Sequence, residues 1–71
     1  PRGNSNYAIA KRAEYVKKDL NEAETYYKLA ILHGERVESA IKDLAGILHQ
    51  KGRTDEACDL LERNSDPFGE E

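Results

Sequence analysis

Cysteine is almost absent from this 71-residue chain, which has only Cys58 and therefore no internal disulfide. Two histidines, His33 and His49, are the only other soft metal ligands, too few and too widely spaced for a structural zinc site. No apolar run approaches the roughly 20 residues that span a bilayer, and residues 1–6 lack the charged-then-apolar pattern of a signal peptide. We therefore expect no metal and no membrane partner. A lone thiol indicates a reducing, intracellular location, either cytoplasmic or nuclear.

Catalytic motifs are also lacking. No Ser, His and Asp set, paired-carboxylate cleft or phosphate-cradling glycine loop can be assembled. Cys58 stands among acidic residues, which disfavour a thiolate, so we interpret it as a small packing residue. His33 precedes Gly34, where an imidazole interacts favourably with the end of a helix dipole. The sequence thus predicts neither an enzyme nor a cofactor.

Charge is unevenly distributed along the chain. Residues 1–18 carry five basic groups and one acidic group, a net charge of +4, whereas residues 19–64 have a net charge of −4. The last seven residues contribute a further −3. This polarity favours head-to-tail contacts or a partner of mixed charge over a polyanion. The chain starts with Pro1 rather than Met, which we take to indicate a processed protein or a fragment.

An internal repeat is visible at an offset of 34 residues. The segment Lys17–Ala23 resembles Lys51–Ala57. Further matches at the same offset are Tyr7 with Ile41, Ala10 with Leu44, Glu22 with Glu56, and Tyr27 with Leu61. An ordered series of matches at one period of this length is typical of helical repeat proteins.

Apolar residues at spacings of three and four predict four amphipathic helices. Their stripes are, in chain order, Tyr7, Ala10 and Ala13 or Glu14; Leu20, Ala23, Tyr27, Ala30 and Ile31; Val37, Ile41, Leu44, Ala45 and Leu48; and Ala57, Leu60 and Leu61. The predicted N-caps are Ser5 or Asn4, Asp19 or Asn21, and Thr54, and the predicted C-terminal glycines are Gly34 and Gly52. Nothing in the pattern indicates a strand.

Short connections predict that consecutive helices pack antiparallel, as two hairpins in an all-α fold. We divide the chain into a disordered leader over 1–4, hairpins over 5–34 and 38–64, and a flexible acidic tail over 65–71. Within this tail, Asp66-Pro67-Phe68 is similar to a motif that endocytic adaptor appendages recognise. We favour reading it as a turn into another repeat.

These residues resemble a tetratricopeptide repeat protein. The resemblance is carried best by the turn and helix start over 48–57 and by the run over 21–30. It implies a right-handed stack of helical hairpins whose first helices line a concave groove. The sequence departs from the family pattern at Lys11, at Lys18, where the family prefers glycine, and at Asn64.

The resemblance also implies a protein-interaction function. Transferred position by position, the groove-facing residues are Ser5, Ala8, Arg12, Tyr15, Ser39, Lys42, Gly46 and His49. The corresponding positions Ala8, Arg12 and Asp43 lack the carboxylate clamp of the chaperone-binding subset, so we do not expect chaperone C-termini as ligands. Our predicted partner-binding residues are Ala8, Arg12, Tyr15, Lys42 and His49, which together would receive an acidic peptide or a helix of a partner protein.

Three alternatives stay open. The same residues are also compatible with an ordinary solvated surface. The basic first helix, with Tyr7 and Tyr15, could bind nucleic acid, although the acidic remainder argues against it. The chain could also be a purely structural oligomerisation domain.

The small number of repeats also leads us to expect self-association. Two repeats are fewer than the three or so that such arrays usually need, so the end hairpins should expose apolar residues. We predict that Leu48, Leu60 and Leu61 mediate self-association or docking onto neighbouring repeats of a larger scaffold protein.

Overall fold

The computed structural model describes residues 5–64, and every element in that range is helical. The elements are α1 (Asn6–Arg12), the π-helical turn η1 (Ala13–Lys17), α2 (Leu20–Leu32), α3 (Val37–Gln50) and α4 (Thr54–Asn64). The predicted all-α class with four helices is therefore confirmed. The predicted leader over 1–4 and the tail over 65–71, including Asp66-Pro67-Phe68, lie outside the described residues.

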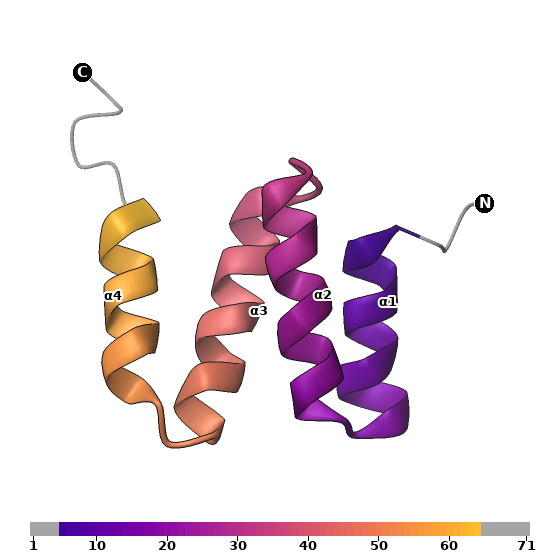
Figure 1. Cartoon of the computed structure of the whole chain (residues 1–71), viewed down its shortest axis with the longest axis horizontal. Helices are drawn as coiled ribbons and strands as arrows, with labels where there is room; N and C mark the ends of the chain where they lie inside the picture. Colours follow the sequence, from indigo (N-terminus) through magenta and orange to yellow (C-terminus); the bar gives the residue numbers. More distant parts are fainter. Residues whose placement is uncertain (1–4, 65–71) are drawn as a thin grey trace.

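The four helices stand side by side in chain order, with α1 and α4 at the two ends of the row (Figure 1). Each helix runs antiparallel to the next, and the packed pairs are α1 with α2, α2 with α3, and α3 with α4. The predicted hairpins are therefore present, and α3 lies between α2 and α4.

Side-chain caps begin the first two long helices as the sequence predicts. The Ala8 amide donates to Ser5 Oγ at 3.1 Å, and the Glu22 amide donates to Asp19 Oδ1 at 3.0 Å. The predicted cap at Thr54 is wrong. Thr54 is already the first residue of α4, and its Oγ1 lies 3.0 Å from His49 Nδ1 instead.

Left-handed residues follow three of the helices. Gly34 has φ 74° and Gly52 has φ 81°, which confirms their predicted place at helix ends. Lys18 takes the same conformation in the first hairpin, with φ 57°, although it carries a Cβ. Its amide donates to the Ala13 carbonyl and closes the wider π turn, a feature that helical periodicity does not distinguish from an ordinary α turn.

The core is built mainly from alanines at the helix crossings and from a few large side chains. Its fully buried members are Ala10, Ala13, Ala23, Tyr27, Ala30, Ala40 and Ile47. Small residues allow the backbones to approach closely. The Tyr27 hydroxyl, buried at the centre, donates to Glu14 Oε1 at 2.7 Å. Burial and this hydrogen bond both raise the pKa of Tyr27.

Leu48 belongs to this core, because only 3% of it is exposed. Its predicted role in self-association is therefore wrong. The physical reason is that α3 is covered on one side by α2 and on the other by α4, so its apolar stripe faces a neighbouring helix rather than solvent. Self-association through Leu61 stays a prediction, because 44% of Leu61 is exposed.

Candidate interaction surface

The predicted groove residues lie on α1, η1 and α3. Arg12, Lys42 and His49 are exposed, Tyr15 is 57% exposed, and Ala8 is half-buried. Exposed aromatic and arginine side chains are enriched among residues that dominate binding energies at protein interfaces. The structure thus leaves four of the five predicted residues accessible to a partner.

These residues do not converge on a single hollow. Lys42 and His49 line a hollow of about 370 Å³ between α3 and α4. Tyr15 lines a different one, of about 320 Å³, where it meets Leu20 of α2 and Gln50 of α3. The predicted groove is therefore an extended surface across two helices and contains two separate depressions.

Asp43 of α3 joins this surface to α1. Its Oδ2 accepts a hydrogen bond from the Tyr7 hydroxyl at 3.0 Å and lies 3.3 Å from Lys11 Nζ. The Lys11 ammonium also lies 4.9 Å from the centre of the Tyr15 ring. Burial is the largest single effect and lowers the pKa of Lys11, but the charge and the hydrogen bond of Asp43, with smaller contributions from Tyr7 and Tyr15, together outweigh it, so the net shift is upward. Lys11 is therefore held by its own chain.

Glu24 of α2 forms the second link between the hairpins, and sequence reasoning missed it. It is 7% exposed, and its Oε1 accepts hydrogen bonds from Lys51 at 2.7 Å and from Arg53 at 2.9 Å. Its other oxygen lies 2.9 Å from Lys28 Nζ. Burial alone would raise the pKa of Glu24, but these donated hydrogen bonds outweigh it and lower the pKa to about 2.

The hollow between α3 and α4 has a floor of small and apolar residues. Its lining residues are Lys42, Ala45, Gly46, His49, Thr54, Ala57, Cys58 and Leu61. A Cβ added at Gly46 would meet no atom within 4 Å, so the space above this glycine is open. A second hollow of about 340 Å³ shares Lys42 and Leu61 and extends the same face towards Glu38 and Asn64. Together they form a continuous strip, here called the α3–α4 face.

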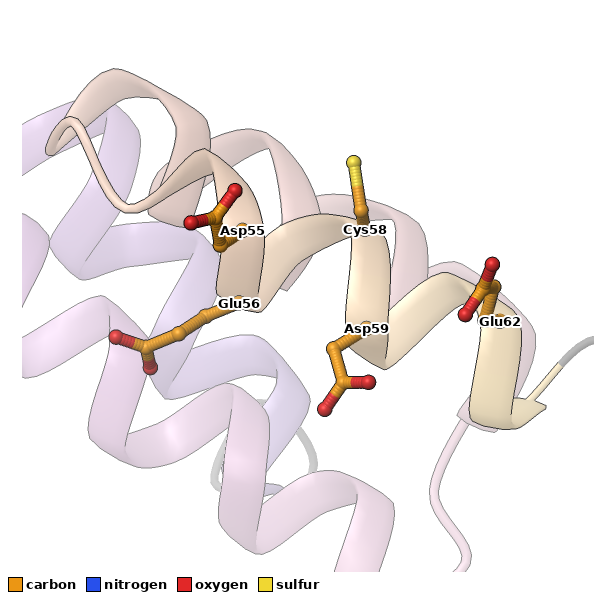
Figure 2. Close-up of a pocket in the computed structure, with 5 residues that line it drawn as sticks. All are labelled: Asp55, Glu56, Cys58, Asp59 and Glu62. Carbon is orange, nitrogen blue, oxygen red and sulfur yellow. The ribbon is translucent and has the colours of Figure 1, made fainter.

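The outer side of α4 is acidic. Figure 2 shows its depression of about 420 Å³, lined by Asp55, Glu56, Cys58, Asp59 and Glu62. Cys58 is exposed, so the expectation that it is a packing residue is wrong. No group of three or more His, Cys, Asp or Glu residues within 5–64 is placed to hold a metal ion.

Leu60 lies on the opposite side of α4 from the acidic depression. It is half-buried and lines a hollow of about 610 Å³ with Lys28, Ile31 and Leu44. Two of the three predicted self-association residues, Leu60 and Leu61, are therefore at least partly accessible. No helix within the described part of the chain is long and apolar enough to cross a membrane.

Comparison with known proteins identifies the second hairpin. Residues 40–62 match the model of the tetratricopeptide repeat family. Protein POLLENLESS 3 of Arabidopsis thaliana is 43% identical over 61 residues, which are 86% of this chain and 14% of that protein. Protein SULFUR DEFICIENCY-INDUCED 2 of the same plant is 39% identical over 62 residues, or 87% of this chain and 20% of that protein. The chain thus spans a fifth or less of these relatives, and no solved structure matches it significantly.

Proposed function

We propose that this chain, which carries a tetratricopeptide-type repeat at residues 40–62, is a non-enzymatic protein-interaction module. Repeats of this type generally bind other proteins. The proposed module binds a peptide or helix of a partner, and it also self-associates or stacks within a larger scaffold protein. Its single cysteine is in keeping with an intracellular location, in the cytoplasm or nucleus.

We further propose that residues 5–34 form a first repeat of the same type as 38–64. Positions that are one repeat length apart take matching structural roles. Lys18 and Gly52 both have positive φ at the hairpin turn, and Ala23 and Ala57 are both buried. These paired roles support a duplicated unit in a chain whose family match covers only the second hairpin.

The observation that carries the binding proposal is the distribution of charge over α1 and α3. Lys11 is neutralised by Asp43, whereas Arg12 and Lys42 form no ion pair with any other residue in 5–64. With Tyr15 and His49 nearby in sequence, these two cations favour an acidic peptide as ligand. The family's chaperone-binding clamp plays no part, because the corresponding positions are occupied by Ala8, Arg12 and Asp43.

The nucleic-acid alternative has less support. Two of the four cations in residues 5–18 face carboxylates of the same chain, Lys11 at Asp43 and Lys17 at Glu22. At the far end of the row, α4 presents an acidic side that would repel a polyanion. Binding to DNA or RNA would show itself through a steep loss of affinity with added salt.

The test uses a displayed library of random ten-residue peptides, because the natural ligand is not known. Peptides selected by the wild-type chain are then measured by fluorescence anisotropy against the double variant Arg12→Glu with Lys42→Glu. We expect an acidic consensus and at least a tenfold loss of affinity in the double variant, because two attractive contacts become repulsive.

The matched control is Arg63→Glu on α4, away from the α1 and α3 surface, which makes the same charge change as either single substitution of the double variant. This variant should retain the affinity of the wild-type chain. Selected peptides without an acidic bias, or equal losses in the control and the double variant, would refute this use of the groove.

A further inference from the structure

The α3–α4 face is the counterpart, one repeat later in the chain, of the surface on which α3 itself packs. Of the residues lining its larger hollow, Ala45, His49, Thr54 and Cys58 correspond to Lys11, Tyr15, Leu20 and Glu24 in the first hairpin. Lys11 pairs with Asp43 of α3 and Glu24 accepts from Lys51 at its end, while Tyr15 and Leu20 line a hollow together with Gln50 of α3. The first hairpin is therefore a template for how a helix would lie on the second.

Three residues of α3 and its C-terminal end make the contacts in this template. Asp43 meets Tyr7 and Lys11. The other two are Gln50, which lines the hollow with Tyr15 and Leu20, and Lys51, which donates to Asn21 and Glu24.

On the second hairpin, the receiving residues are different. Ile41 stands in place of Tyr7, and Ala45 in place of Lys11, so neither of the two donors that hold Asp43 has a counterpart at these positions. Asp55 takes the place of Asn21, which leaves a negative charge where the template has a neutral amide. A helix that fits this face therefore needs an apolar residue at the Asp43 position and a cation at the Lys51 position.

The first helix of this same chain has that pattern. At the offset of one repeat, Ile9 corresponds to Asp43, Val16 to Gln50, and Lys17 to Lys51. Val16 is 62% exposed in the isolated chain, so a second copy can remove its apolar surface from water. Lys17 pairs with Glu22 at 2.7 Å, but Lys17 is exposed and Glu22 is only half-buried, and pairs near the surface contribute little.

The net charges of the two proposed contact surfaces are opposite, which also favours their association. Residues 5–18 carry four basic groups and one acidic group, a net charge of +3, of which Lys11 and Lys17 also pair with Asp43 and Glu22. Helix α4 carries four acidic groups and one basic group, a net charge of −3. These two segments form opposite ends of the row of helices (Figure 1). Opposite charge at opposite ends favours contact between copies in a single orientation.

We propose that the α3–α4 face binds the first helix of a second copy of this chain, head to tail. Ile9 of the incoming copy packs over the hollows that Ile41 and Ala45 line with the more exposed Leu61, and its Lys17 pairs with Asp55. This inference deepens the self-association part of the proposed function and assigns the surfaces involved. Because the two surfaces differ, the contact does not close on itself, and copies add in an open row.

Sedimentation equilibrium of the 71-residue chain tests the association. We expect the mean mass of the wild-type chain to rise with concentration, from 8.0 kDa past that of two chains. Val16→Glu blocks one surface and Leu61→Glu blocks the other, and each variant alone should stay monomeric. Both substituted side chains are exposed, so circular dichroism should show unchanged helix content.

Mixing the two variants is the decisive measurement. Each retains one intact surface, so the mixture should reach the mass of two chains and stop there. Leu32→Glu is the matched control, since Leu32 is 75% exposed at the end of α2 and should leave association unchanged.

If the wild-type chain stays monomeric at millimolar concentration, a second copy does not bind the α3–α4 face, and the proposal is overturned. The face would then bind a helix of another chain or of a further repeat. A mixture that stays monomeric while the wild type associates would overturn the head-to-tail arrangement. Lys42 lines the α3–α4 face and Arg12 lies on α1, so a second copy and an acidic peptide would compete for this surface. Peptide affinity is measured on its own, and the two proposals can therefore still fail separately.

Discussion

Replacing Glu24 by glutamine should weaken the whole fold, although the change preserves size and shape. The carboxylate of Glu24 is buried in α2 and accepts from Lys51 and Arg53, which lie at the turn of the second hairpin. A neutral amide cannot balance these cations, and its NH₂ group is itself a donor. The variant therefore removes the main polar link between the hairpins.

The magnitude follows from the pKa of Glu24, which falls from an ordinary 4.5 to about 2 in the folded chain. Each unit of pKa difference between folded and unfolded states is worth about 1.4 kcal/mol, so full ionisation stabilises the fold by about 3 kcal/mol. The partners are partly exposed, and solvent screening reduces this to about 2 kcal/mol. For a domain of this size, such a loss lowers Tm by about 8–16 °C.

The dependence on pH has a definite sign. Because the pKa of Glu24 is lowered on folding, its stabilisation is complete above pH 4.5 and disappears as the pH falls towards 2. Thermal unfolding followed by circular dichroism at several pH values between 2 and 7 measures this directly. Wild-type Tm should drop through this window, and the drop should be smaller in Glu24→Gln.

Glu56→Gln is the control, because Glu56 also pairs with Arg53 but is exposed and contacts only that one cation. Its effect on Tm should be much smaller. If Glu24→Gln unfolds at the wild-type temperature and with the same pH profile, the ionic cluster does not hold the two hairpins together, and the reasoning fails.

Four further substitutions test the packing and the turns by urea unfolding. Lys18→Gly should raise the free energy of unfolding by about 0.5–1 kcal/mol, since Lys18 has a left-handed φ of 57° that glycine adopts without a Cβ clash; an unchanged or lower value would contradict this. Leu48→Ala should lower the free energy of unfolding by about 2–4 kcal/mol, because Leu48 is buried, and Leu61→Ala should lower it by under about 1 kcal/mol, because Leu61 is exposed. Equal losses would mean that α4 does not cover α3 as described. Tyr27→Phe should lower the free energy of unfolding by about 1 kcal/mol through loss of the hydrogen bond to Glu14, and an unchanged midpoint would argue against that bond.

Local patterns predicted the elements well, for identifiable reasons. Ser5 and Asp19 cap helices because a short side-chain oxygen reaches the free amides of the first turn, an interaction that spans only three residues. Gly34 and Gly52 end helices because their backbone tolerates positive φ. At Thr54 the same reasoning failed, because its hydroxyl bonds His49 of the preceding helix.

The candidate surface was predicted only in part. The binding residues on α1, η1 and α3 were predicted from the family resemblance, and four of the five are exposed. Leu48 was wrongly assigned to self-association. An apolar stripe indicates that a side chain packs against another surface, but not whether that surface is a helix of the same chain or a partner. Glu24 was overlooked because its partners are 27 and 29 residues away in sequence, and no local pattern marks a carboxylate that will meet two cations of another hairpin.

The amino-acid sequence alone therefore determined the helical class, the glycine turns after α2 and α3 and the polarity of charge, since each can be read from residue types along the chain. The tertiary structure decided which apolar residues remain accessible, which cations are neutralised within the chain, and that α1 and α4 form the two ends of the row. Those properties depend on which helices pack against each other, because burial and ion pairing are set by neighbours in space rather than in sequence.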